Sequence, residues 1–383
     1  MKSNYSYQIY SSTTQLPEKW NELAVATIFL SREYLTILEK SAPANMSCHF
    51  IGLFEDEDLV GIAVSQFLDL NQLESFGDRD QCIKSSLRNI AFKNFCSHIL
   101  LIGNNTLTGQ NAFIISENAN GTEVLKTLKK AVLALKEIFK KRGTKVHMCS
   151  LKDFCEDGLP LFEIPEFDPY LRFTTQPNML FAVRDQWKTE EDYVAALSKK
   201  YRDQYKRARK KAAGLTKRQL SLDEIIAQEE VIYDLYYHVA QSAPFNTFFL
   251  PKNHFAVFKE QLQENFLFYG YFENEKLIGF NTLIKNGSDL DTYFLGYDDN
   301  VQREKMLYLN MLYDMIGYAI KEQFKTIIFA RTALEIKSSV GATPLKMYGM
   351  MRHDNKFINR RLDFFFRYLE PETIWKERHP FQD

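Results

Sequence analysis

The chain reads FLFYGYFENEKLIGF over residues 266–280, two apolar runs joined by a short charged turn. This pattern predicts an antiparallel hairpin. A run rich in aromatic and branched residues at 290–297 predicts a third strand, and apolar residues at helical spacing over 308–321 predict a helix. A further apolar strand, 326–330, leads into a polar segment that predicts a short helix. The expected order is hairpin, strand, helix, strand, short helix.

That order resembles the core of the GNAT-type acyltransferases. The resemblance implies that strands 290–297 and 326–330 splay apart and that an acyl donor lies in the gap between them. It rests on the pattern of elements, so it supports a fold more than a reaction.

The hairpin occurs twice in the chain. Residues 50–61 align without a gap against residues 268–279, and the segments 29–35 and 249–255 match at nearly the same offset. A helix at 122–141 also corresponds to the later helix. Self-similarity on this scale sets the architecture.

We therefore expect an α/β (α+β) protein of two tandem GNAT-like domains, each a mixed twisted sheet flanked by helices. A proline-rich stretch, 157–177, predicts the crossing between them. The expected domains are residues 1–175 and residues 176–383, and the second contains an inserted basic helical segment at about 190–235.

Composition narrows the class of partner and the compartment. The 383 residues carry a net charge of −1, so no global field favours nucleic acid, and no DNA partner is expected. The five cysteines show no metal-ligand spacing, and no metal is expected. No apolar signal core or bilayer-length run is present, which predicts no transmembrane segment and a cytoplasmic location.

The basic segment is the second informative stretch. Residues 199–218 contain ten Lys or Arg and one acid, Asp203. Like charges on one helix face weaken the helix, so such a face suggests an anionic partner. The predicted carrier-binding residues share one face: Lys199, Arg202, Lys206 and Arg209. The alternative is a solvated face covered by acidic groups from elsewhere.

This region resembles the Fem-type, FemAB-like transferases. The resemblance rests on Thr175-Gln176-Pro177, the strand at 179–183, the acidic helix start at 190–193 and the basic run at 197–211. The best-known members move amino acids from aminoacyl-tRNA onto cell-wall precursors, and relatives are acyltransferases. It implies an N-acyltransferase or aminoacyltransferase that forms an amide. The donor would be carried by tRNA, acyl carrier protein or CoA, with acyl-CoA or another acyl carrier as co-substrate and a small-molecule or cell-envelope precursor amine as acceptor.

Candidate site residues follow the two strands that should splay. Acyl transfer to an amine needs a group that removes a proton and a group that stabilises the oxyanion. The expected catalytic residues are Asp291, Tyr297, Asp298, Glu335 and Lys337, and the expected donor-binding residues are Tyr293, Gln302, Arg303, Lys305 and Arg331.

The two-residue period of a strand predicts that Asp291, Tyr293 and Tyr297 share one face. The loop expected after the third strand lacks the glycines that would let the backbone touch a pyrophosphate. Two alternatives remain open at this point. The tyrosines are ordinary core residues with Glu335 and Lys337 at the surface, or the chain is a non-catalytic binding module that kept the fold.

Overall fold

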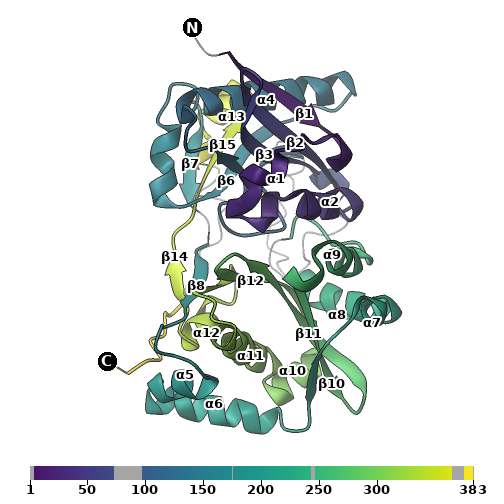
Figure 1. Cartoon of the computed structure of the whole chain (residues 1–383), viewed down its shortest axis with the longest axis vertical. Helices are drawn as coiled ribbons and strands as arrows, with labels where there is room; N and C mark the ends of the chain where they lie inside the picture. Colours follow the sequence, from purple (N-terminus) through teal and green to yellow (C-terminus); the bar gives the residue numbers. More distant parts are fainter. Residues whose placement is uncertain (1–3, 73–96, 175, 243–245, 365–374, 383) are drawn as a thin grey trace. The chain divides into compact units, whose positions relative to one another are not determined.

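A computed structural model describes residues 4–72, 97–174, 176–242, 246–364 and 375–382 (Figure 1). The chain divides into two compact units, which we treat separately. Unit 1 comprises Met1–Thr175, Pro244–Pro251 and Lys346–Glu372, and unit 2 comprises Gln176–Ala243, Lys252–Leu345 and Thr373–Asp383.

In the described residues of unit 1, eight strands form one mixed sheet in the order β1-β2-β3-β4-β6-β15-β7, with β5 paired to β3. The pair β4–β6 is parallel and the other pairs are antiparallel. Its elements are β1 (Tyr5–Tyr10), α1 (Trp20–Leu23), α2 (Arg32–Lys40), β2 (Met46–Glu55), β3 (Asp58–Asp69), β4 (His98–Ile102), β5 (Phe113–Ile115), α4 (Gly121–Lys141), β6 (Met148–Phe154), β7 (Leu171–Thr174), β15 (Tyr348–His353) and α13 (Lys356–Asn359).

Unit 2 contains a seven-stranded sheet in its described residues, in the order β14-β8-β13-β12-β11-β10-β9. Only β12 and β13 pair in parallel there. Its strands are β8 (Asn178–Ala182), β9 (Thr216–Gln219), β10 (Phe266–Glu273), β11 (Lys276–Asn286), β12 (Asp289–Tyr297), β13 (Thr326–Ala330) and β14 (Thr343–Leu345). Its helices are α5 (Glu190–Ala196), α6 (Lys199–Lys211), α7 (Leu222–Ala227), α8 (Glu229–Gln241), α9 (His254–Leu262), α10 (Asp299–Lys305), α11 (Leu307–Lys321) and α12 (Leu334–Ser339).

The internal duplication is visible in the two hairpins. Each repeat runs hairpin, strand, helix, parallel strand: β2-β3-β4-α4-β6 in unit 1 and β10-β11-β12-α11-β13 in unit 2. Both hairpins contain a register shift at the same place, after Leu53 in one and after Tyr271 in the other. The predicted pair of related mixed α/β domains is therefore confirmed.

A matched pair of glycines explains part of the shared hairpin sequence. A Cβ at Gly270 would lie 2.8 Å from the Phe272 ring and 3.0 Å from Leu277. At Gly52 the equivalent contacts are 3.0 Å to Phe54 and 3.3 Å to Leu59. In both hairpins a large ring folds back over the glycine, so a side chain there would collide with it.

Two details differ from the sequence-based expectation. Segments 244–251 and 346–372, expected in the second domain, belong to unit 1, where β15 pairs with β6 and β7. The expected loop after β12 is instead the helix α10, capped by the Asp298 carboxylate, which accepts from the Asn300 N–H. None of the helices in the described part of the chain combines the length and apolarity that a membrane crossing requires.

Candidate functional site

The two parallel strands of unit 2 diverge after a short paired stretch. β12 pairs with β13 only from Asp289 to Asp291, opposite Thr326 to Ile328, although β12 continues to Tyr297. Thr292 makes the last link by donating its hydroxyl to the Ile328 carbonyl at 3.0 Å. Beyond this fork, the outer half of β12 has no ladder partner on the β13 side among the described strands.

A bulge lies in β12 just beyond the fork. Asn281 pairs with Leu295 and Leu283 pairs with Thr292, so Tyr293 and Phe294 together oppose the single residue Thr282. Thr282 donates its hydroxyl to the Phe294 carbonyl at 2.7 Å, which fixes the irregular backbone. A bulge shifts the side-chain alternation by one residue.

The other arm of the fork ends in a strained turn. Ala330, Thr332 and Ala333 all have positive φ, which residues with a Cβ adopt at a cost of about 1–3 kcal/mol each. Lys337 holds this turn, because its ammonium donates to the carbonyls of Arg331 at 2.6 Å and Ala330 at 3.4 Å. Burial lowers the pKa of Lys337 to about 7.

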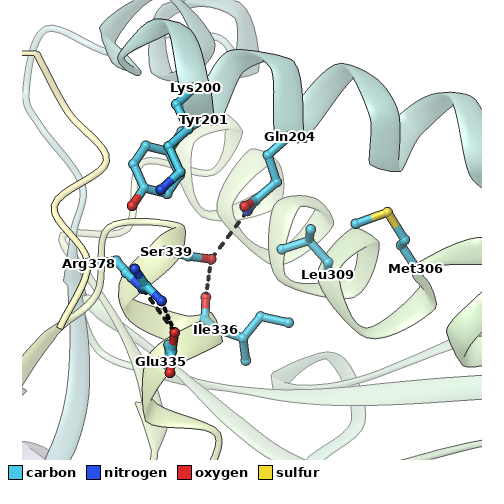
Figure 2. Close-up of a pocket in the computed structure, with 9 residues that line it drawn as sticks. All are labelled: Lys200, Tyr201, Gln204, Met306, Leu309, Glu335, Ile336, Ser339 and Arg378. Carbon is cyan, nitrogen blue, oxygen red and sulfur yellow. Dashed lines mark hydrogen bonds and ion pairs between the residues drawn. The ribbon is translucent and has the colours of Figure 1, made fainter. Parts of the chain in front are cut away.

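A pocket of about 520 Å³ lies between the helices that follow the two arms (Figure 2). Residues of α6 line one wall, the start of α11 lines another, and α12 with the C-terminal segment closes the rest. The lining residues are Lys200, Tyr201, Gln204, Met306, Leu309, Glu335, Ile336, Ser339 and Arg378. Gln204 joins the walls by donating to the Ser339 hydroxyl at 3.3 Å.

The chemistry of this pocket favours an anion. Arg378 is neutralised by Glu335, to which it donates from Nε at 3.0 Å, whereas Lys200 is exposed and carries a positive charge. The first N–H groups of a helix also point outward with a partial positive charge, and α11 begins at this pocket. Hydroxyl and amide groups of Tyr201, Gln204 and Ser339 add polar partners.

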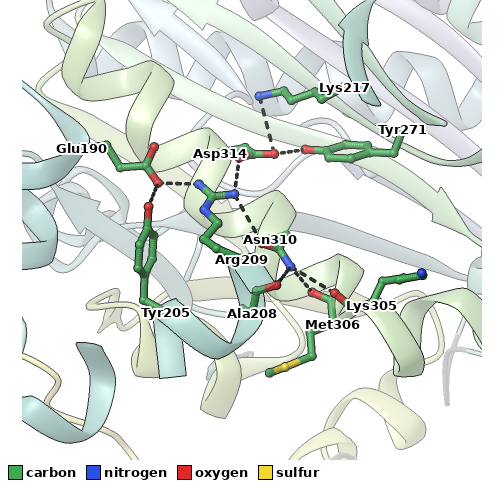
Figure 3. A network of polar contacts seen from close by, with 10 residues as sticks. All are labelled: Glu190, Tyr205, Ala208, Arg209, Lys217, Tyr271, Lys305, Met306, Asn310 and Asp314. Atoms are coloured by element: carbon green, nitrogen blue, oxygen red, sulfur yellow. Dashed lines mark hydrogen bonds and ion pairs between the residues drawn. The ribbon is translucent and has the colours of Figure 1, made fainter. Parts of the chain in front are cut away.

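A polar network fixes the basic helix α6 against α11 (Figure 3). Arg209 bonds Asp314 at 2.6 Å and also pairs with Glu190, which in turn accepts from Tyr205 at 2.9 Å. Asp314 also accepts from Tyr271 at 2.8 Å. Burial alone would lower the pKa of Arg209, but the carboxylates of Asp314 and Glu190 raise it above its usual value.

Asn310 continues the same connection to the beginning of α11. Its amide donates to the Ala208 carbonyl of α6 at 3.0 Å and to the Lys305 and Met306 carbonyls at 3.1 Å each. The pocket wall made by Lys200 and Gln204 is therefore held in place by contacts one to two helical turns farther along α6.

Comparison with solved structures places this arrangement among known folds. The crystal structure of FemX aligns with a TM-score of 0.51 and 10% identity, covering 90% of this chain and 98% of FemX. A tandem GNAT protein from the clavulanic acid biosynthesis pathway, solved without AcCoA, aligns with a TM-score of 0.50 and 10% identity, covering 92% and 99%. The chain has a FemAB-like tandem GNAT fold. No protein-family model and no curated protein matches the sequence.

This FemAB-like fold is one used by acyltransferases. At such low identity the likeness concerns the fold alone, so the residues of this chain must indicate the chemistry.

The predicted catalytic residues are spread over both faces of the sheet. Asp291 is buried, and burial raises the pKa of its carboxyl to about 7. It pairs with Ile284, which pairs with Phe266, whose ring contacts Phe258 of α9, so Asp291 faces α9. Tyr297 instead packs against Tyr308 of α11. The expectation that Asp291, Tyr293 and Tyr297 share a face is wrong, because the bulge shifts the alternation.

The other three predicted catalytic residues have visible structural partners. Asp298 caps α10, Lys337 holds the turn after β13, and Glu335 pairs with Arg378 at the pocket rim. Of these, Glu335 lines the pocket.

The predicted donor-binding residues are also divided by the structure. Gln302, Arg303 and Lys305 lie on α10, where Arg303 is exposed and Lys305 pairs with Glu273 at 2.9 Å. Arg331 lies in the strained turn, and burial lowers its pKa to about 10. Tyr293 lies at the bulge and faces α9, as described below.

The predicted carrier-binding face of α6 needs correction. Lys199 and Lys206 are exposed, but Arg202 donates to the carbonyls of Leu197 and Ala195 at the end of α5, and Arg209 belongs to the network. Helical spacing alone could not show that acidic and carbonyl groups from distant segments cover this face.

Several lining residues were not expected from the sequence. Tyr201, Gln204 and Ser339 have ordinary helical spacing, and Arg378 is about 40 residues from its partner in the chain. The available signal was Lys200, since it stands beside Tyr201 at the start of the basic run.

Proposed function

We propose that this chain is an N-acyltransferase or aminoacyltransferase that takes its acyl group from an anionic carrier and forms an amide on an amine. The pocket at the start of α11 is the observation that carries the proposal. It lies between the helices following the two arms of the fork and presents Lys200 and helix N–H groups to an anion.

The carrier is expected to follow α6 away from the pocket. Lys200, Gln204, Arg207 and Lys211 recur at helical spacing, so they form one row that begins at the pocket wall. Lys200, Arg207 and Lys211 are all exposed. The row spans about 16 Å of helix, a length that suits a macromolecular polyanion better than a single phosphate.

This row replaces the face first predicted. It supports aminoacyl-tRNA or an acyl carrier protein as carrier, and CoA would use the pocket alone. The acceptor is proposed to be an amine, either a small molecule or a cell-envelope precursor.

Binding measurements test the carrier. Bulk tRNA, acyl carrier protein and CoA are titrated at two salt concentrations against wild type and the triple variant Lys200→Ala, Arg207→Ala, Lys211→Ala. The control removes three exposed lysines from α4 of unit 1: Lys130, Lys140 and Lys141.

A polyanion should bind the pocket variant more weakly and with a flatter salt dependence, by about 0.7–0.9 in log–log slope per lost phosphate contact. The α4 control should match wild type. Transfer is then followed as amine-dependent release of the acyl group from each donor that binds. If wild type binds none of the three carriers, the proposal fails and α6 is a solvated structural helix.

A further inference from the structure

A hydrogen-bonded Tyr–His pair lies on the face of unit 2 opposite the pocket. The Tyr293 hydroxyl and Nε2 of His254 are 3.0 Å apart, and their rings stack with centroids 5.9 Å apart at 20°. Tyr293 is a bulge residue of β12, and His254 is the first residue of α9. Residues 39 apart in the sequence are thus brought together beside the fork.

The pair is held in a rigid aromatic setting. The Phe258 ring lies 4.8 Å from that of His254 and 4.7 Å from that of Tyr293. His254 is only 1% exposed, whereas Tyr293 keeps part of its surface accessible. The tyrosine is therefore the member of the pair that a ligand can touch.

The bulge decides the direction of Tyr293. In a regular strand Tyr293 and Phe294 would point to opposite faces. Here Phe294 contacts Tyr236 of α8 and also lies 4.6 Å from the Tyr293 ring, so both aromatic side chains lie on the α8–α9 side. The Thr282 hydroxyl bonded to the Phe294 carbonyl maintains this geometry.

Asp291 is the neighbouring titratable group on this face. It lies two residues before Tyr293 on β12, is buried, and accepts from the Asn286 amide at 3.4 Å. The α9 face beside the fork thus contains a phenol, an imidazole and a carboxyl group, whereas the pocket opens on the α11 side.

We infer that Tyr293 is a catalytic residue for the acceptor amine and that His254 is its proton-accepting partner. The inference rests on the proposed function: the carrier lies on the α11 side, and the amine approaches from the α9 side of the fork. Burial disfavours an imidazolium, so His254 in its neutral form can accept the phenolic proton through Nε2.

In the proposed step the amine nitrogen adds to the acyl carbon, and the bond from that carbon to the carrier's oxygen or sulfur breaks with its electron pair. The nitrogen loses one proton to Tyr293 as the tyrosine passes its own proton to His254. The imidazolium then returns a proton to water through Tyr293, and the leaving group gains one from water. General acid–base assistance of this kind contributes typically about 10²–10⁴-fold in rate.

Three variants separate catalysis from structure, in transfer assays with acetyl-CoA or alanyl-tRNA and a mixture of amino acids and alkyl amines. Tyr293→Phe keeps the ring against Phe258 and removes only the hydroxyl, so it should fold and lose about 10²-fold or more in kcat with carrier binding unchanged. His254→Gln keeps a polar partner without a titrating group and should lose the acidic limb of the pH–rate profile. Asp291→Asn should retain that limb.

Tyr318→Phe is the matched control, since Tyr318 is a half-buried tyrosine at the far end of α11 and should show wild-type rates. Near-wild-type turnover by Tyr293→Phe, or an unchanged acidic limb in His254→Gln, overturns the inference while the proposed function stands. If His254→Gln does not fold, loss of the same limb in Tyr293→Phe supports the inference and its retention overturns it. If wild type transfers from neither donor, the proposed function fails and the inference with it.

Discussion

Arg209 of α6 bonds Asp314 of α11 at 2.6 Å, and this contact converts a residue of the basic helix into part of the interior. The same guanidinium pairs with Glu190, and Asp314 also lies 3.8 Å from Lys217. The charges in this network balance closely, so α6 can present its remaining lysines to solvent while one side stays attached to the domain.

Arg209→Ala should destabilise the protein by about 2–3 kcal/mol, because Asp314 and Glu190 lose their shared partner while remaining largely covered. Urea unfolding measures the change. Arg207→Ala, on the exposed side of the same helix, should cost less than about 0.5 kcal/mol. Equal effects of the two substitutions would contradict the structural role given to the network.

Asp291→Asn should change how stability depends on pH. The folded pKa of about 7 exceeds the unfolded value of about 3.9, so the folded protein binds the extra proton between these values. The stabilising contribution is complete below about pH 4 and is lost as the pH rises through 7. Between pH 5 and 8 the wild type should lose about 2–3 kcal/mol relative to Asp291→Asn.

Urea unfolding at pH 5, 6.5 and 8 checks this difference, with Asp185→Asn as an exposed control that should follow wild type. Parallel curves for wild type and Asp291→Asn would show that the carboxyl is not buried as described.

Gly341→Ala tests the seating of the C-terminal segment that supplies Arg378 to the pocket. Gly341 has φ of +109°, and a Cβ there would lie 2.5 Å from the Phe381 ring. The substitution should cost about 1–2 kcal/mol for the backbone and a further 1 kcal/mol or more for the collision. Displacement of this segment should also weaken carrier binding at the pocket.

Gly214→Ala is the matched control, since its φ is +94° and no atom lies within 4 Å of the added Cβ. It should show the backbone cost alone, with carrier binding intact. Thermal unfolding and the carrier titration together decide the result, and the prediction is wrong if the two glycine variants behave alike.

The sequence by itself determined the architecture. The hairpin at residues 266–280, its repeat at 50–61 and the strand–helix–strand order after each are written in local patterns of apolar residues, which the structure realises as β2-β3 and β10-β11. Such periodicities depend on neighbours in the chain, so they can be read without knowing the rest of the molecule.

Tertiary structure decided where the side chains of the site point. The two-residue period predicted one face for Tyr293 and Tyr297, but pairing with β11 leaves an extra residue in β12 and sends them to opposite sides. Whether a strand bulges depends on its partner's register, which its own sequence does not contain.

The roles of the charged residues were also decided at long range. Arg209 reads as one of ten basic residues along 199–218, yet Glu190 and Asp314 arrive from segments 19 and 105 residues away to neutralise it. His254 has no distinguishing sequence context until α9 packs beside the bulge. A local pattern selects helix or strand because it acts on adjacent residues, whereas the environment of a charge is set by whichever distant segment packs across it.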